Sequence, residues 1–161
     1  MKTAVIYYSL EGNTDFIAKK IAAKTKGDLI ELVPEKAYPT GKVSKFFWGG
    51  KSVVFGEKPK LKNAKIDIES YDRIFIGTPI WAGKFTPPIK TFLDTYKISG
   101  KDVVLFACHG GGGSDKCFAK MKDILKGNNI VGAYDFLDPF FHSSTEDWDL
   151  KVEEILKKSN I

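Results

Sequence analysis

Ser9-Leu10-Glu11-Gly12-Asn13-Thr14 is the stretch of sequence that decides the fold. It follows a short apolar and β-branched run from Thr3 to Tyr8, which predicts a strand, and it precedes apolar residues that recur on a helical period from Phe16 to Ala22. A strand therefore passes into a helix across a loop that contains a glycine and hydroxyl groups. Because the first turn of a helix has unpaired N–H donors and a partial positive charge, this loop is predicted to bind a phosphate group.

Within this loop, Gly12 allows the backbone to approach an anion, while Ser9, Asn13 and Thr14 offer side-chain donors. A simpler interpretation is that Asn13 or Thr14 only caps the helix, as these residue types often do. Neither the nucleotide-triphosphate pattern G-x-x-x-x-G-K-[ST] nor the dinucleotide pattern G-x-G-x-x-G occurs here. The ligand expected at this loop is therefore a terminal phosphate monoester.

The length and composition suit one globular domain over residues 1–161, because 43% hydrophobic and 13% aromatic side chains can bury a substantial core. The formal net charge is +5, and lysines are concentrated between Lys42 and Lys65. These lysines could attract nucleic acid or an acidic protein, but solvated surface lysines explain them more simply. Arg73 is the only arginine, and arginine is the usual residue for recognising bases, so nucleic acid is not an expected partner.

Cys108 and Cys117 are the only cysteines, and they fit neither a disulfide framework nor a zinc site. They indicate a reducing compartment, and no metal ligands are predicted. No run approaches the roughly 18 apolar residues of a membrane-spanning helix, and the first apolar stretch is too short for the core of a signal peptide. We therefore expect a soluble, cytoplasmic protein with no membrane span.

Strands and helices are predicted to alternate along the whole chain. After the first pair, further strands are expected near residues 28–33, 74–76, 103–107 and 130–136. Helices are expected near residues 43–55, 87–96 and 115–126, and a last one runs from a cap at Ser144 or Thr145 to Lys158. This alternation predicts an α/β fold, a three-layer, doubly wound, five-stranded parallel sheet with helices on both faces.

Three loops at strand ends are expected to form one site, because ligands of doubly wound sheets bind at the carboxyl ends of the strands. They are Ser9–Thr14, Thr78–Lys84 and Cys108–Ser114. In the second loop, Trp81 suits stacking on a flat ring, although it could equally fold inward as part of the core. In the third, the run Gly110–Gly113 presents bare backbone that suits the edge of a heterocycle, or it is simply a flexible turn.

Taken together, these three loops resemble those of the flavodoxin family, and the similarity spans essentially the whole chain. The resemblance implies the strand order 2-1-3-4-5 of the short-chain form and flavin mononucleotide (FMN) as cofactor. It implies that the first loop binds the FMN phosphate, that Trp81 stacks on the isoalloxazine, and that the third loop contacts the ring's pyrimidine edge. The cofactor-binding residues that the resemblance implies are Ser9, Leu10, Glu11, Gly12, Asn13, Thr14, Thr78, Pro79, Ile80, Trp81, Ala82, Gly83, Lys84, Cys108, His109, Gly110 and Gly111. No catalytic residues are expected.

Three features depart from the family's pattern. Glu11 stands where the phosphate loop commonly has a threonine, so its carboxylate is expected to point outward, away from a phosphate. The third loop lacks the tyrosine that covers the second flavin face in many relatives, and offers only His109 and glycines. The chain is basic, whereas relatives are usually acidic. Lys84 would stabilise the reduced anionic flavin if it approached the ring, but it is more simply directed to solvent.

By this resemblance, the expected function is to carry low-potential electrons between larger redox enzymes, with redox partner proteins and a monomeric or weakly dimeric state. An FMN-dependent NAD(P)H/quinone-type reductase is the alternative, favoured by an open flavin face and the basic charge. A flavin-free interaction module is a second alternative. A phosphate-receiver domain is excluded, because Tyr8-Ser9 and Gly77-Thr78 stand where its acidic residues belong. A low-molecular-weight phosphatase needs Cys-x5-Arg, and no arginine follows Cys108.

Overall fold

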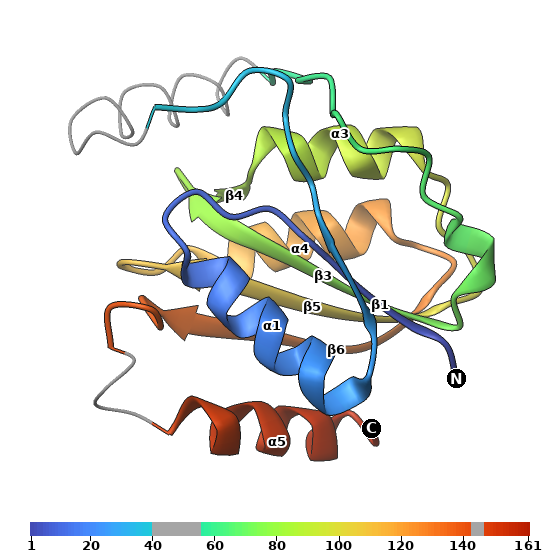
Figure 1. Ribbon diagram of the computed structural model, residues 1–161, viewed down its shortest axis with the longest axis vertical. Coiled ribbons are helices and arrows are strands. Elements are labelled where there is room, and N and C mark those ends of the chain that lie inside the picture. The colour runs from blue at the N-terminus through green and yellow to red at the C-terminus, as the bar shows by residue number, and fades with distance from the viewer. Residues whose placement is uncertain (40–55, 143–146) are drawn as a thin grey trace.

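A parallel sheet forms the centre of the computed structural model, which describes residues 1–39, 56–142 and 147–161 (Figure 1). Five parallel strands lie in the order β2-β1-β3-β5-β6. Their bounds are β1 Thr3–Tyr7, β2 Asp28–Glu31, β3 Arg73–Trp81, β5 Asp102–His109 and β6 Asn129–Leu137. This order confirms the predicted 2-1-3-4-5 arrangement, counted over the parallel strands.

A sixth, short strand was not expected from the sequence. β4, Lys84–Phe85, pairs antiparallel with the end of β3, so that Ile80 lies opposite Phe85 and Trp81 lies opposite Lys84. The prediction that residues 78–84 form a loop is therefore wrong, because β3 continues to Trp81 and turns back as a hairpin. The turn is made by Ala82 and Gly83, which both have positive φ.

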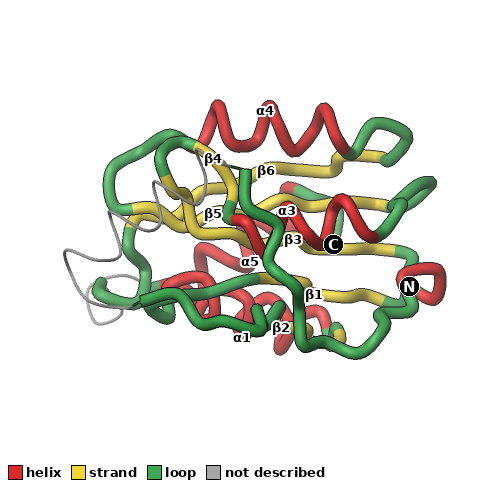
Figure 2. Tube along the Cα trace, turned by 90° about the horizontal axis from the view of Figure 1, so that it is seen from above, coloured by secondary structure: helices red, strands yellow, loops and turns green. Residues whose placement is uncertain are grey.

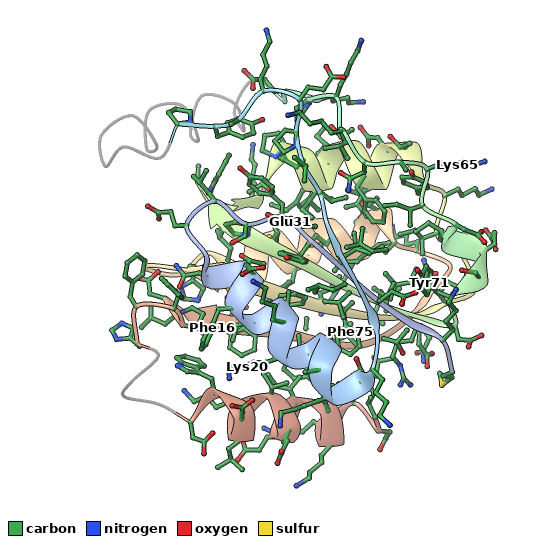
Figure 3. The ribbon with its side chains drawn as sticks, in the orientation of Figure 1. Phe16, Lys20, Glu31, Lys65, Tyr71 and Phe75 are labelled. Carbon is green, nitrogen blue, oxygen red and sulfur yellow. The ribbon has the colours of Figure 1, made fainter. Side chains whose placement is uncertain are left out.

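In the described ranges, two helices cover each face of the sheet (Figures 1 and 2). α1, Asn13–Thr25, and α5, Trp148–Lys158, pack together on one face, and α3, Pro87–Thr95, and α4, Ser114–Ile124, lie on the other. A short 3-10 helix, Ile68–Ser70, precedes β3. Lys20 of α1 donates to Asp149 of α5 at 2.8 Å, which joins the two helices on the solvent side; Figure 3 labels Lys20 on α1. None of the helices in the described ranges is long and apolar enough to cross a bilayer.

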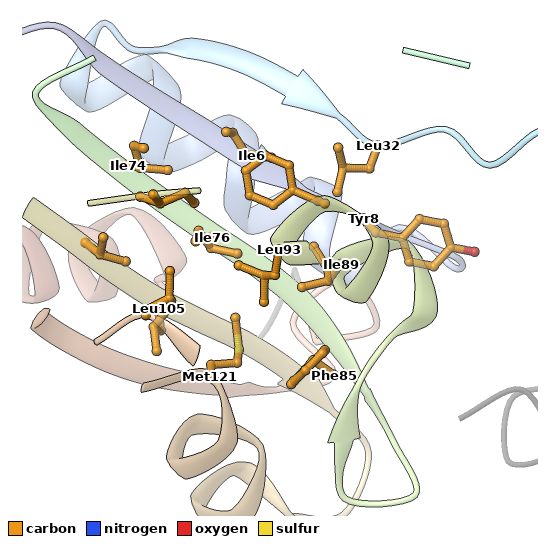
Figure 4. Packing of buried hydrophobic residues seen from close by; sticks show 14 of the residues in the cluster. Ile6, Tyr8, Leu32, Ile74, Ile76, Phe85, Ile89, Leu93, Leu105 and Met121 are labelled. Carbon is orange, nitrogen blue, oxygen red and sulfur yellow. The ribbon is translucent and has the colours of Figure 1, made fainter. Parts of the chain in front are cut away.

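Alternate residues of the central strands enter two separate cores. Val104 and Phe106 of β5 pack toward α1 and α5, whereas Val103 and Leu105 pack toward α3 and α4. Figure 4 shows the second of these cores, with Leu105 beside the helix residues around it. Because both faces are buried, the strand reads as a continuous apolar run rather than an alternating one.

The helix starts follow local chemistry. Thr86 is the N-cap residue of α3 and Pro87 is its first residue, as predicted. Gly12, in the left-handed conformation, is the N-cap residue of α1, so neither Asn13 nor Thr14 caps this helix. The α5 cap is Asp147, whose carboxylate accepts from the Leu150 N–H at 2.9 Å. The predicted caps Ser144 and Thr145, and the helix predicted over residues 43–55, lie outside the described residues.

Gly77, in the middle of β3, leaves room for the aromatic ring of Phe106 on the neighbouring strand. It pairs in register with Phe106 of β5, and a Cβ atom placed at Gly77 would lie 2.1 Å from Cζ of the Phe106 ring. The ring therefore occupies the space above the glycine backbone. This contact sets the packing of β3 against β5 immediately before both strands reach the edge of the sheet where the loops gather.

Candidate functional site

One cavity of about 330 Å³ lies at the carboxyl ends of the parallel strands, where the predicted loops meet. It is lined by residues that follow β1, by the end of β3, by the end of β5 and by the segment after β6. These residues are Ser9, Leu10, Glu11, Asn13, Thr14, Pro79, Ile80, Trp81, Cys108, His109, Gly110, Asp138 and Phe141. The structure thus brings parts of all three predicted loops to one place.

Several predicted site residues do not line this cavity. Gly12 and Gly111 lie beside it in the chain, and the buried Thr78 hydroxyl instead accepts the N–H of Thr86 at 3.1 Å. Ala82, Gly83 and Lys84 line a different cavity. Ala82 and Gly83 form the turn of the hairpin, and Lys84 follows it. Of the second predicted loop, the strand residues Pro79, Ile80 and Trp81 remain in the site.

Two buried hydroxyl groups of the first loop have unmet hydrogen-bonding capacity. Ser9 Oγ and Thr14 Oγ1 are inaccessible to solvent and form no hydrogen bond of ordinary geometry in the described part of the chain. Both residues line the cavity next to the start of α1, where Gly12 opens the helix. Buried polar groups are nearly always paired, so two hydroxyls of one loop without such a bond indicate a ligand with acceptor oxygens.

Cys108 supplies part of the wall between the first and third loops and is not suited to act as a nucleophile. Its side chain is buried, and burial raises the pKa of the thiol to about 12, an effect that the neighbouring Thr14 hydroxyl offsets only in part. A thiol held neutral in this way is a small apolar group rather than a reactive one. Cys108 and Cys117 are both free cysteines.

Trp81 packs against two tyrosines and also lines the cavity. The ring centroid of Trp81 lies 5.9 Å from that of Tyr8 and 5.2 Å from that of Tyr38, with interplanar angles of 87° and 77°. Edge-to-face packing of this kind is favourable and restrains the indole. Trp81 therefore belongs partly to the core and partly to the site. The sequence had left open whether it would fold into the core or face a flat ligand.

The imidazole of His109 closes the glycine-rich loop after β5. Its Nδ1 accepts the backbone N–H of Gly112 at 2.9 Å, so the ring proton must lie on Nε2, which contacts the Asp135 carboxylate at 2.7 Å. Both ring nitrogens are thereby engaged. The loop is tied to its own strand by a side chain, and the ring is tied to β6.

The segment after β6 forms a fourth wall that sequence reasoning missed. Asp138 and Phe141 line the cavity, and the Asp138 N–H donates to the carbonyl of His109 at 3.0 Å. The Phe140 N–H donates to Asn13 Oδ1 at 2.8 Å, and its ring lies over Gly12. The signal available in the sequence was Phe140-Phe141 directly beyond a strand that ends at the same edge as the others.

The charge at the cavity is negative. Glu11 and Asp138 line it, and no lysine or arginine is among the lining residues of the described chain. The Lys84 ammonium belongs to the other cavity, so the structure does not place it at this site. A group that gained negative charge here would be destabilised by the Asp138 carboxylate, less so where solvent screens it.

The sequence model of the flavodoxin family matches residues 2–136. Among solved structures, a candidate flavoprotein from Bacteroides eggerthii is 26% identical, with 99% of this chain and 98% of that chain covered and a TM-score of 0.81. A flavoprotein in complex with FMN from Lactobacillus acidophilus is 27% identical, with 88% and 96% covered and a TM-score of 0.72. Oxidised flavodoxin 2 from Bacillus cereus, 18% identical, shares the fold over 99% and 98% of the two chains with a TM-score of 0.64. The residues matched by the family model include the loop Ser9–Thr14, the hairpin that carries Trp81 and the strand that ends at His109. The chain therefore belongs to the flavodoxin family.

Proposed function

We propose that this protein binds FMN in the cavity at the strand ends and carries low-potential electrons between redox enzymes. The observation that carries the proposal is the pair of buried hydroxyls beside the first turn of α1, Ser9 Oγ and Thr14 Oγ1, which form no hydrogen bond of ordinary geometry in the described chain. A phosphate monoester offers acceptor oxygens of the required kind at that place. The relative from Lactobacillus acidophilus, which was crystallised with FMN, supports the choice of this phosphate ester.

The remaining walls suit the rest of the cofactor. Trp81, held by Tyr8 and Tyr38, offers an aromatic surface for the flavin ring, and the strand end from Cys108 to Gly110 offers backbone groups for the ring's polar edge. When bound, FMN supplies electron transfer in single or paired steps, and the protein sets which is easier. Binding and orienting the ring are therefore the tasks of these residues.

The charge of the cavity favours a strongly reducing carrier. Asp138 lines the cavity, and its carboxylate opposes the extra negative charge of a reduced, anionic ring. His109 has both ring nitrogens engaged, by Gly112 and by Asp135, so it is not free to deliver a proton to a substrate. These features support electron transfer to partner proteins over substrate reduction within the site. Two free cysteines agree with work in a reducing cytoplasm.

A reductase of quinone-type acceptors that uses NAD(P)H is the second candidate. It is favoured by the exposed lysines around the second cavity beside the β3–β4 hairpin, which could hold an anionic electron donor near the site. The carrier and the reductase differ in what oxidises and reduces the flavin. They share the same FMN site.

The test is FMN binding followed by anaerobic reductive titration of the loaded protein. We expect quenching of FMN fluorescence on binding, and two separate stages of reduction at low potential for a carrier. Thr14→Val should weaken FMN binding about tenfold or more, because a hydrogen bond to a charged phosphate is lost. Thr95→Val is the matched control, since its hydroxyl bonds only the Thr91 carbonyl on the exposed side of α3.

Protein that fails to bind FMN, or equal affinity in Thr14→Val and Thr95→Val, would overturn the proposed site. Rapid oxidation of NAD(P)H with a quinone, together with reduction in a single stage, would replace the carrier by the reductase.

A further inference from the structure

A second cavity, here called the lysine pocket, lies beside the β3–β4 hairpin and shares no lining residue with the flavin cavity in the described chain. Its volume is about 540 Å³, within the range of roughly 300 to 1,000 Å³ that is usual for small-molecule sites. The walls come from the hairpin, from the first turns of α3 and from one face of α4, which lie on the same side of the sheet (Figure 1). Neither the family's fold nor the proposed electron transfer requires a pocket here.

Four ammonium groups surround this pocket. Lys84 comes from the hairpin, Lys90 from α3, and Lys116 and Lys120 from α4. Lys116 and Lys120 are one helical turn apart, a spacing at which like charges destabilise a helix by about 0.2 to 0.5 kcal/mol. The Lys116–Lys120 pair therefore slightly destabilises α4 while it places two cations on the wall of the cavity.

Three of these four lysines form no close ion pair. In the described part of the chain, Lys84, Lys116 and Lys120 have no carboxylate within 4.0 Å, although the charge of Lys120 acts on Asp123 at longer range. Glu57 is the only carboxylate among the described residues of the wall. Lys90 contacts Asp94 at 2.9 Å, but the same carboxylate also binds Lys58 at 2.6 Å. An anion in the pocket would therefore meet an excess of cations at short range.

The rest of the wall is apolar and suits a flat ring. Phe85 and Pro87 form the inner surface, and Ile124, one turn beyond Lys120 on α4, is 40% exposed at the rim. An inorganic anion would leave these groups unused. A ligand with phosphates at one end and a planar, weakly polar body at the other would contact both parts of the wall.

The lysine pocket and the flavin cavity are lined by neighbouring residues of the same hairpin. Ile80 and Trp81 of the hairpin line the flavin cavity, while Ala82, Gly83 and Lys84 line the lysine pocket. Gly83 also packs against Gly113 of the glycine-rich loop, where an added Cβ would lie 3.1 Å from the Gly83 Cα. A ligand in the lysine pocket would therefore touch the same short hairpin that holds the indole.

We propose that the lysine pocket binds a nucleotide, with its phosphates at Lys84, Lys90, Lys116 and Lys120 and its base against Phe85, Pro87 and Ile124. The nucleotide has two possible sources with the same chemistry: a free nucleotide, or the phosphate-bearing half of a nicotinamide dinucleotide that brings electrons to the flavin. Only the second source rests on the proposed FMN function.

The test is calorimetric titration of ADP into FMN-loaded protein freed of excess FMN, and into flavin-free protein. FMN blocks the first site, so binding to the loaded protein reports a second one. We expect saturable binding of ADP that weakens at least about tenfold in Lys116→Gln/Lys120→Gln. The control is Lys122→Gln/Lys157→Gln, which removes the same charge from exposed positions outside the pocket and should change affinity less than about twofold.

Pyrophosphate and adenosine, titrated separately, test the two halves of the pocket. Weaker binding of each than of ADP supports the proposal, whereas equal binding of pyrophosphate and ADP overturns the role of the apolar wall. Absence of saturable ADP binding, or equal loss in both double variants, overturns the site. Tighter binding of NADPH than of ADP to the loaded protein identifies the dinucleotide source, and equal binding identifies a free nucleotide. If FMN does not bind, the flavin-free titrations still decide the pocket.

Discussion

His109 and Asp135 are joined at 2.7 Å between Nε2 and Oδ2, and this contact fixes the imidazole that holds the Gly112 N–H at the edge of the flavin cavity. The carboxylate lies on β6 and the histidine ends β5, so the pair links two strands as well as orienting a ring. Because Nδ1 must remain unprotonated to accept from Gly112, the pair also selects the ring tautomer.

We expect Asp135→Ala to weaken FMN binding about fivefold, because the freed imidazole can turn or change tautomer and release the glycine loop, a loss of about 1 kcal/mol. The measurement is a fluorescence titration with FMN. Asp123→Ala is the control, since that carboxylate contacts only the exposed Lys126 at the end of α4. Equal affinities in the two variants would mean that the imidazole does not need its partner.

Asp138→Asn should raise the midpoint potential of the bound flavin by on the order of 30 to 60 mV, because one carboxylate no longer opposes the reduced ring. The change is measured by anaerobic titration against reference dyes. Asp147→Asn, at the cap of α5 and outside the cavity lining, removes the same charge and should leave the potential nearly unchanged. A matching shift in both variants would indicate a general effect of net charge.

Gly77→Ala should lower the free energy of unfolding by about 1 to 3 kcal/mol, because the new methyl group would overlap the Phe106 ring and both strands are buried. Urea unfolding of the two proteins measures this difference. Gly111→Ala is the comparison, since its added Cβ would meet nothing within 4 Å. A small cost at Gly77 would show that the ring can move aside.

Stability should fall at alkaline pH because of the two buried thiols. Burial raises the pKa of Cys108 and of Cys117 from 9.0 to about 12. The unfolded chain therefore releases these protons first, so the stabilising effect is complete below about pH 9 and is lost as the pH rises toward 12. From about pH 9 to about pH 10, each thiol should remove about 1 kcal/mol of stability.

Urea unfolding under reducing conditions at several pH values gives this slope. A Cys108→Ala/Cys117→Ala variant starts from a lower stability but should lose less of it over the same interval. An unchanged slope in the double variant would assign the alkaline loss to other groups, such as the buried tyrosines.

Most strands and helix starts could be predicted from the sequence because they depend on residues that are close together in the chain. The apolar run at residues 103–107, the Thr86-Pro87 helix start and the Gly12 loop each reflect the chemistry of a few neighbouring residues. The strand order was implied by the resemblance to the flavodoxin family, and the structure confirms it. Thr78-Pro79, in contrast, has the composition of a turn, but the backbone stays extended because β3 pairs with both β5 and β4. That pairing depends on residues outside the segment.

The site was harder to predict wherever it depends on distant contacts. Asp138 and Phe141 reach the cavity because the Phe140 N–H binds Asn13, a residue 127 positions away, and no local pattern predicts that bond. Lys84 was included among the cofactor-binding residues that the resemblance implies, although solvent was the simpler expectation for its ammonium. It follows the turn at Ala82 and Gly83 and lines a different cavity.

The hydrogen bond between Asn13 and Phe140 also has a consequence for biosynthesis. The first loop leaves the ribosome early, yet one of the walls beside it comes from the segment after β6. A nascent chain that ended after β5 would present the helix start and the unpaired hydroxyls to water without their cover. The pocket is therefore completed only after translation has passed Phe141, so loading with a cofactor belongs to the last stage of folding rather than to its beginning.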